Sequence, residues 1–230
     1  MKKEALQGGT GAELSHGVSP AVVKRLPRYF RYLRELIRQG RLRISSGELS
    51  ELMQVTASQI RQDLNCFGGF GQQGYGYNIN HLYAKICEIL GVGEGYNAVV
   101  IGAGNLGRAL VRSPMFEKRG VNILGMFDVD STQVGRTIGD TTVYPMEEIR
   151  EFCRTYPVDI AVLTLPKQAA EEVAKCLYEA GIRGFWNFTG NELELPPDAV
   201  AENVHIGDSL MTLCFELRRM EMQEDGEENT

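Results

Sequence analysis

A glycine-rich turn between a predicted strand and a predicted helix restricts the fold of this chain more than any other feature. Residues 99–110 read VVIGAGNLGRAL. Gly102, Gly104 and Gly107 have the spacing GxGxxG, in which the first permits a tight turn, the second lets the backbone approach a pyrophosphate, and the third lets the helix pack on the strand. A second predicted strand ends at Asp128, about 20 residues further on. These features predict the first βαβ unit of a dinucleotide-binding domain, with the pyrophosphate at the start of the helix.

Asp128 predicts which dinucleotide this turn binds. A carboxylate at this position accepts hydrogen bonds from the adenosine ribose hydroxyls, and its charge would repel a 2′-phosphate. The sequence therefore predicts NAD(H) rather than NADP(H). Asp130 is a second candidate for the role, and the alternative is that Asp128 only ends a strand. The predicted cofactor-binding residues are Gly102, Ala103, Gly104, Asn105, Leu106, Gly107, Asp128, Thr164, Pro166 and Phe188.

Beyond Asp128 the chain continues to alternate between helical and strand patterns. The patterns predict a helix over residues 146–154, a strand over 158–166, a helix over 166–181 and a strand over 184–188. Such alternation builds a doubly wound parallel sheet, in which ligands bind at the carboxyl ends of the strands. Thr164, Pro166 and Phe188 lie at two of these ends.

The residues before the turn predict three helices and a β-hairpin. The start signals are a capping Ser followed by Pro for the first helix and a capping box for each of the others: Ser19 and Pro20, Ser45 and Glu48, Thr56 and Gln59. Pro27 is expected to kink or restart the first helix. In residues 68–80 aromatic residues alternate with glycines, which is typical of a short hairpin, with a flexible linker as the alternative. Three helices and a hairpin predict a winged helix.

The charge of the chain is divided unevenly between its two parts. Residues 1–95 hold 12 Lys and Arg against 8 Asp and Glu, whereas the remainder holds 12 against 22. Residues 24–43 alone hold eight basic side chains and one acidic one. A polyanion is the expected partner of this stretch, and a solvated basic helix face is the alternative.

The third predicted helix has the side chains of a DNA-reading helix. Ile60 and Leu64 fall on one side, which leaves polar residues exposed near the N-terminal end. Arg pairs with guanine, Gln with adenine, and Ser bonds a phosphate, so the set suits a major groove, although helical patterning alone also fits an ordinary amphipathic pair. The predicted DNA-binding residues are Arg25, Arg28, Ser58, Gln59, Arg61, Gln62, Gln72 and Gln73.

The last predicted helix carries apolar side chains on more than one side. Leu213 and Leu217 lie on one stripe, but Met211 and Phe215 lie off it. A helix of this kind needs a partner on each side, so we expect it to pack between two copies of the chain, with docking on its own sheet as the alternative.

The fold predicted from these patterns is α/β, a winged-helix domain followed by a Rossmann-type domain and a C-terminal helix. The expected segments are a disordered N-terminal arm (1–18), the winged helix (19–80), a connecting helix (81–95), the Rossmann domain (96–206), a dimer helix (207–222) and an acidic, disordered tail (223–230).

The sequence predicts a regulator rather than an enzyme. Its histidines are His16, His81 and His205, and no Tyr is followed by Lys at YxxxK spacing, so no acid or base for hydride transfer is evident. The five cysteines form no CxxC pair, and no metal site is predicted. Neither a signal peptide nor a membrane span is evident, so we expect a cytoplasmic protein.

The order of motifs resembles the Rex family of redox-sensing transcriptional repressors. The segments that carry the resemblance are KRLPRYFRYL, SSGELSE, SQIRQDL, GFGQQGYGYN, GAGNLG, FDVD, LTLP and NFT. The resemblance implies a homodimer whose winged helices bind a palindromic operator, with NAD(H) in each Rossmann domain. NAD+ is then compatible with DNA binding, and NADH closes the dimer and releases it. Arg61 takes the place of the recognition-helix arginine, and Asp128 that of the ribose-binding acid.

This chain departs from the family pattern at the wing and at the switch. Gln72 and Gln73 stand at the wing tip, where Lys or Arg is usual, Ser113 stands where Tyr is often found, and His205 where Asp is often found. Together with Arg25 and Ile206, Ser113 and His205 are the switch candidates. An apolar surrounding near Phe188 and Ile206 would disfavour the cationic, oxidised nicotinamide, and a His at position 205 would make switching depend on pH near neutrality.

Three other functions are open from the residues alone. One is a small NAD-dependent reductase, which the missing acid and substrate domain disfavour. Another keeps the DNA-binding head but lets the Rossmann domain bind a CoA derivative, which would leave Asp128 without a purpose. In the last, Cys66 is the redox switch, although no second cysteine lies near it in the sequence.

Overall fold

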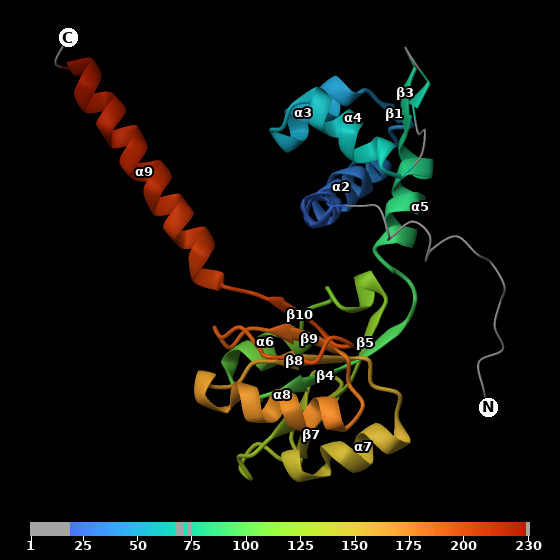
Figure 1. Cartoon of the computed structure of the whole chain (residues 1–230), viewed down its shortest axis with the longest axis vertical. Helices are drawn as coiled ribbons and strands as arrows, with labels where there is room; N and C mark the ends of the chain where they lie inside the picture. Colours follow the sequence, from blue (N-terminus) through green and yellow to red (C-terminus); the bar gives the residue numbers. More distant parts are fainter. Residues whose placement is uncertain (1–18, 68–70, 73–74, 229–230) are drawn as a thin grey trace. The chain divides into compact units, whose positions relative to one another are not determined.

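The computed structural model describes residues 19–67, 71–72 and 75–228, and the chain divides into two compact units, Met1–Glu94 and Gly95–Thr230. The expected N-terminal arm and Gln73 lie outside the described residues. Figure 1 shows the elements of both units along the chain.

The first unit, the head, is a helical bundle with a small sheet. Its elements are α2 (Pro20–Arg38), β1 (Arg43–Ile44), α3 (Ser46–Met53), α4 (Ala57–Asn65), β2 (Gly71–Gln72), β3 (Gly76–Asn78) and α5 (Ile79–Ile89). The sheet has the order β1-β3-β2 and is antiparallel. The tight pair α3 and α4 followed by a hairpin confirms the winged helix. α5 was expected as a connector, but Ile79, Leu82 and Ile86 are buried in the core of the head.

The helix starts follow the capping signals. Ser19 accepts a hydrogen bond from the Val22 N–H at 3.4 Å, and Ser45 and Glu48 form a complete capping box. Thr56 caps α4, but only half of the expected box forms, because the Gln59 side chain bonds elsewhere. α2 is continuous through Pro27, contrary to the expected restart. Its apolar face, buried from Val22 to Leu36, compensates for the missing backbone hydrogen bond.

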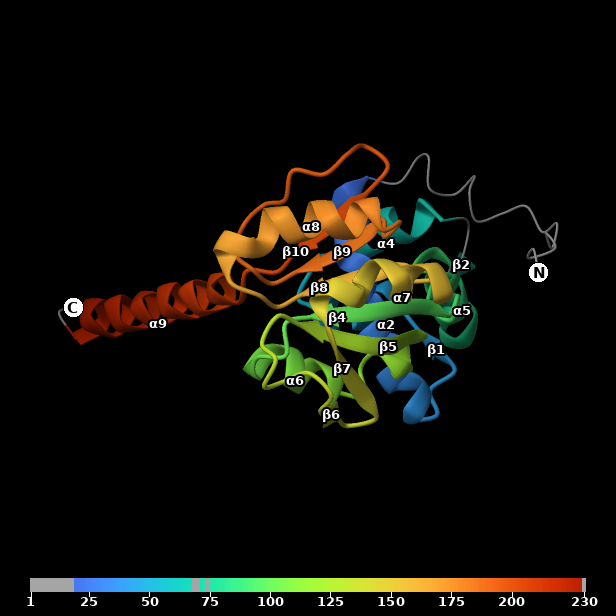
Figure 2. The same ribbon diagram turned by 90° about the horizontal axis from the view of Figure 1, so that it is seen from below.

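The second unit is built on a seven-stranded sheet of order β10-β9-β8-β4-β5-β7-β6, parallel except for β6. Its strands are β4 (Tyr96–Ile101), β5 (Val121–Asp128), β6 (Thr137–Ile138), β7 (Thr141–Pro145), β8 (Ile160–Leu163), β9 (Gly184–Asn187) and β10 (Val200–Asn203). Its α-helices are α6 (Asn105–Val111), α7 (Ile149–Thr155), α8 (Ala170–Glu179) and α9 (Ile206–Glu228). α7 and α8 cover one face and α6 covers the other, as Figure 2 shows. This arrangement confirms the doubly wound sheet.

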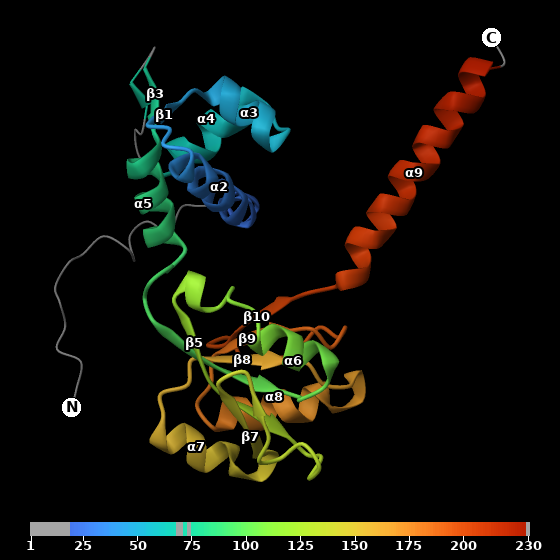
Figure 3. The ribbon, with the colours of Figure 1, turned by 180° about the vertical axis from the view of Figure 1, so that it is seen from behind.

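The C-terminal helix α9 runs as one continuous helix (Figure 3). It extends to Glu228, beyond the expected end at Met222, because the acidic residues that follow include strong helix formers. Leu210, Met211 and Phe215 are 61%, 65% and 63% exposed, so α9 does not dock on its own sheet. Within the described residues, no helix is long and apolar enough to cross a membrane.

Candidate functional sites

The glycine turn packs against the end of β8 more tightly than any side chain would allow. Gly102 has a φ of +101°, and an added Cβ would lie 2.5 Å from the Thr164 carbonyl oxygen. An added Cβ at Gly107 would collide with the Gly102 carbonyl. The Thr164 hydroxyl shares its one hydrogen between the carbonyl oxygens of Ile101 and Gly102, at 3.0 and 2.9 Å. Thr164, predicted to contact the cofactor, therefore holds the turn in shape.

Gly104 differs from its two neighbouring glycines because it faces open space. An added Cβ would meet nothing within 4 Å. The turn is thus closed on its protein side by Gly102 and Gly107 and open at Gly104, where a phosphate must approach the backbone. Asn105 is exposed and Leu106 half-buried at the start of α6. The shape of the turn fits a dinucleotide pyrophosphate.

Asp128 ties the end of β5 to this turn. Its Oδ2 accepts a hydrogen bond from the Ala103 N–H at 2.5 Å, and its Oδ1 accepts one from the Asp130 N–H at 2.8 Å. A carboxylate has about four acceptor positions, so about two remain for ribose hydroxyls. Asp130 accepts from the Thr132 N–H at 2.9 Å within its own loop, so the geometry favours Asp128 for the ribose.

The remaining predicted cofactor and switch residues are half-buried or exposed in the single chain. Pro166 is exposed, and Phe188 is half-buried with its ring 4.7 Å from that of Trp186. Ser113 accepts a weak hydrogen bond from the Met115 N–H at 3.4 Å. His205 is exposed and Ile206 is 61% exposed, so Ile206 does not enclose a nicotinamide within one chain.

In the head, a fully buried carboxylate joins the recognition helix α4 to α2. Asp63 is 0% exposed. Arg25 donates to both of its oxygens, from Nε at 2.7 Å and from Nη2 at 2.6 Å. The Tyr29 hydroxyl and the Gln59 amide donate to it as well, at 2.9 and 2.8 Å. Burial raises the pKa of Asp63, but these hydrogen bonds outweigh burial and hold the pKa below its ordinary value.

Three of the predicted DNA-binding residues have hydrogen-bond partners within the head. Arg25 and Gln59 are bound to Asp63, and Arg28 donates to the Met53 carbonyl at the end of α3 at 2.6 Å. Buried polar groups take the partners that burial leaves them, so these three side chains set the position of the helix pair. Arg25, also a switch candidate, is paired with Asp63 in the single chain.

The exposed side chains of α4 remain available for base reading. Ser58 and Gln62 are exposed, and Arg61 is exposed with its Nη1 3.1 Å from the Ser46 hydroxyl. Gln72 lies in β2, and Gln73 lies outside the described residues. Sequence reasoning missed Asp63, whose signal is a carboxylate beside Ile60 and Leu64 on the apolar side of the helix.

Two further absences concern metal and sulfur chemistry. Among the described residues, no three His, Cys, Asp or Glu side chains are grouped to hold a metal ion. The five cysteines are free, and Cys66 is exposed with its Sγ 3.3 Å from the Gln62 carbonyl oxygen.

A winged-helix unit joined to a Rossmann unit with a carboxylate at the end of β5 defines a class of transcriptional regulators with a nucleotide-binding sensor domain. Residues 17–65 match the family model described as putative DNA-binding protein N-terminus, and residues 93–190 match the one described as CoA binding domain. The chain belongs to the Rex family of redox-sensing transcriptional repressors. This membership confirms the expected regulator and disfavours the reductase.

Similar proteins cover nearly the whole chain. A redox-sensing transcriptional repressor Rex of Caldanaerobacter subterraneus subsp. tengcongensis is 50% identical over 205 residues, 89% of this chain and 92% of the relative. The structure of RSP in complex with β-NAD+ and operator DNA is 48% identical, with a TM-score of 0.83 over 93% of this chain and 98% of that one. The structure of RSP with β-NADH is 45% identical, with a TM-score of 0.83 over 90% and 98%.

Proposed function

We propose that this protein represses transcription as a homodimer on palindromic operator DNA and leaves the DNA when NADH replaces NAD+. The observation that carries the proposal is the glycine turn, open at Gly104 and bordered by a half-buried Asp128, in the same chain as a winged helix. The RSP complexes with β-NAD+ and operator DNA and with β-NADH support it. The relatives are bacterial proteins, and bacterial DNA lies in the cytoplasm, so we propose that the repressor acts there.

In the proposed complex, the backbone at Gly104 approaches the pyrophosphate, and Asp128 accepts the ribose hydroxyls. The bound dinucleotide supplies a nicotinamide ring that is cationic when oxidised and neutral when reduced. Apolar side chains such as Phe188 disfavour the cation, because burial penalises an unpaired charge. Ile206, at the start of α9, completes this surrounding in the dimer.

On DNA, Ser58, Arg61 and Gln62 reach the major groove from the exposed side of α4. The Asp63 network fixes the orientation of α4 on α2, so the readers enter the groove as one rigid surface. Position 72, in β2 of the wing, holds Gln rather than Lys or Arg, so it adds no formal charge for binding phosphate.

The dimer is proposed from surfaces that a single chain leaves uncovered. α9 exposes apolar side chains along its described length, and an apolar hollow of about 1020 Å³ includes Met115, Phe116, Ile160 and Trp186. Large exposed apolar surfaces mark association sites. A second copy of the chain covers α9 in this proposal, and the operator half-sites follow its two-fold symmetry.

The experiment uses a duplex selected from random DNA for binding to this protein. Gel shifts are run with NAD+, with NADH and with neither. We expect NADH to release the duplex and NAD+ to retain it, and an equal effect of both forms would reject the sensing proposal. Asp128→Ala should retain DNA binding but lose the response to NADH.

One observation favours a second ligand for the Rossmann unit, namely its match to the CoA binding domain model. A thermal-shift series with NADH, NADPH and CoA separates the two ligands. Stabilisation by NADH at lower concentration than by CoA supports the redox sensor, and the reverse order supports a CoA-responsive regulator.

A further inference from the structure

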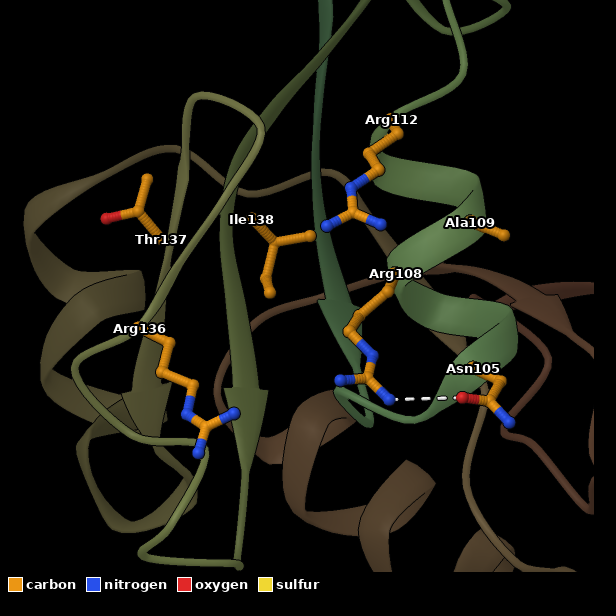
Figure 4. A pocket seen from close by; sticks show the side chains of 7 residues that line it. All are labelled: Asn105, Arg108, Ala109, Arg112, Arg136, Thr137 and Ile138. Atoms are coloured by element: carbon orange, nitrogen blue, oxygen red, sulfur yellow. Dashed lines mark hydrogen bonds between the residues drawn. The ribbon is translucent and has the colours of Figure 1, made fainter.

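An open hollow beside the glycine turn gathers three arginines. It has a volume of about 590 Å³ and lies between α6 and the start of β6. Figure 4 shows Arg108 and Arg112 reaching out from α6 and Arg136 from the opposite wall, with Ile138 between them. The hollow thus has a cationic rim over an apolar floor, since Ile138 is 5% exposed.

These three guanidinium groups lack the carboxylate partners that other arginines of the unit have. Arg150 pairs with Glu179 at 2.7 Å, Arg154 with Glu151 at 2.9 Å, and Arg183 with Asp198 at 3.1 Å. In contrast, no ion pair within 4.0 Å involves the arginines of the hollow, in the part of the chain that the structure describes.

This difference arises in a strongly acidic unit. Residues 96–230 hold 22 Asp and Glu against 12 Lys and Arg, so carboxylates are plentiful. Arg108 donates to the Asn105 amide oxygen at 3.0 Å, which orients it along the hollow. Asp130 is attracted to Arg136, but it takes its hydrogen bonds from Thr132. Three adjacent cations, none of which forms an ion pair with a carboxylate in the described part of the chain, offer a site for an anion.

The geometry of the rim indicates which anion. A carboxylate offers two oxygens in one plane, whereas a phosphate monoester offers three terminal oxygens in different directions and carries up to two charges. Guanidinium forks from two opposite walls match the second pattern. A polyanion such as DNA is disfavoured by the net negative charge of the unit.

We propose that Arg108, Arg112 and Arg136 bind a phosphate dianion, free or as a monoester, beside the adenosine end of the dinucleotide crevice. Asn105 directly follows Gly104, and Arg136 lies on the loop that begins after Asp128, so the hollow adjoins that end. The dianion has two sources. One is a free phosphate. The other is the ribose phosphate of a nucleotide in the crevice, such as the 2′-phosphate of NADP+, whose repulsion by Asp128 the three guanidinium charges would have to offset. The nucleotide source rests on the proposed function, whereas the free-phosphate source does not.

The test compares wild type with the double variant Arg112→Gln, Arg136→Gln and with a matched control, Arg150→Gln, Arg154→Gln. Calorimetry at constant ionic strength measures inorganic phosphate, NAD+ and NADP+. Because the double variant loses two charged side chains that donate hydrogen bonds, its affinity for the phosphate ligand should fall about tenfold or more.

Each outcome separates the alternatives. A free-phosphate site predicts that inorganic phosphate binds to wild type and to the control, and that it binds more weakly to the double variant. A ribose-phosphate site predicts that the double variant loses affinity for NADP+ only and that its affinity for NAD+ is unchanged. Equal affinities of all three proteins for phosphate and NADP+ would overturn the proposal. Absence of NAD+ binding in all three, with phosphate binding retained, would instead reject the proposed function alone.

Discussion

Two aspartates, Asp63 in the head and Asp128 in the Rossmann unit, serve the two units in opposite ways. Asp63 in the head is fully buried, and four donor groups from three side chains occupy its oxygens. Asp128 in the Rossmann unit is half-buried, and its two hydrogen-bond partners are backbone N–H groups. The first carboxylate has little capacity left and holds structure together. The second retains acceptor positions and is available to a ligand.

The largest effect is expected at Asp63. Asp63→Ala leaves the Arg25 charge without its partner, and we expect the head to lose about 3 kcal/mol of unfolding free energy. The chain has a single Trp, Trp186, in the Rossmann unit. In urea, the helical circular dichroism transition of the head should move to lower concentration, while the Trp fluorescence transition stays in place.

Glu35→Ala is the control for this comparison, because Glu35 is exposed and pairs with Arg38 at 3.7 Å. It should change the stability by less than about 1 kcal/mol. Equal transitions for Asp63→Ala and wild type would show that the buried network does not hold the head together.

A smaller effect, on binding, is expected at Asp128. Asp128→Asn removes the charge from the proposed ribose site, which should weaken the binding of NADH by about 2–3 kcal/mol. Asn keeps only one of the two oxygens that accept the Ala103 and Asp130 N–H groups, so the unit should also lose about 1 kcal/mol of stability. Calorimetry with NADH measures the loss of affinity. Asp130→Asn is the matched control and should bind NADH with the affinity of wild type. An equal loss of affinity in both variants would show that Asp128 is not the specific partner of the ribose hydroxyls.

A variant on the exposed side of α4 tests whether the residues that read DNA bases are distinct from those that hold the helix in position. Arg61→Ala should weaken binding to the selected operator duplex by about 2 kcal/mol without changing the urea transition of the head. Gel shifts against specific and random duplexes measure the loss. Arg38→Ala, an exposed arginine on α2, serves as the control, and identical losses of specificity would contradict the assignment of Arg61.

The smallest effect concerns an exposed carboxylate. The backbone N–H of Ser45, then the Arg41 and Ser45 side chains, lower the pKa of Glu48 to about 2. The folded pKa lies below the unfolded value, so the stabilisation is present above about pH 4.5 and is lost as the pH falls toward 2. NMR titration of the Glu48 carboxyl should give a midpoint near 2, and a midpoint near 4.5 would show that the capping box does not persist in solution.

Features with fixed local spacing could be predicted from the sequence. The glycine turn and Asp128 were found because the chemistry of a pyrophosphate and a ribose fixes their separation along the chain. The helix starts at Ser19 and Ser45 were found because a cap and its helix are neighbours in sequence.

Features that depend on distant partners could not be predicted. Asp63 and Arg25 are 38 residues apart, and only the packing of α4 on α2 shows that the arginine of a basic helix faces inward. β6, β7 and β10 were missed because strands of two, five and four residues carry too little alternation to detect. The arginine hollow was missed for a similar reason, because Arg136 is distant from α6 in the sequence and only the fold brings them to one hollow.

The exposed helix α9 has a consequence for the concentration at which the protein works. In the proposed dimer its apolar side chains lose contact with water only when two chains meet, so the amount of complete repressor grows with the square of the chain concentration when monomers predominate. Occupancy of the operator then rises more steeply than the supply of protein. A cell could thereby silence its target genes abruptly with a modest increase in synthesis.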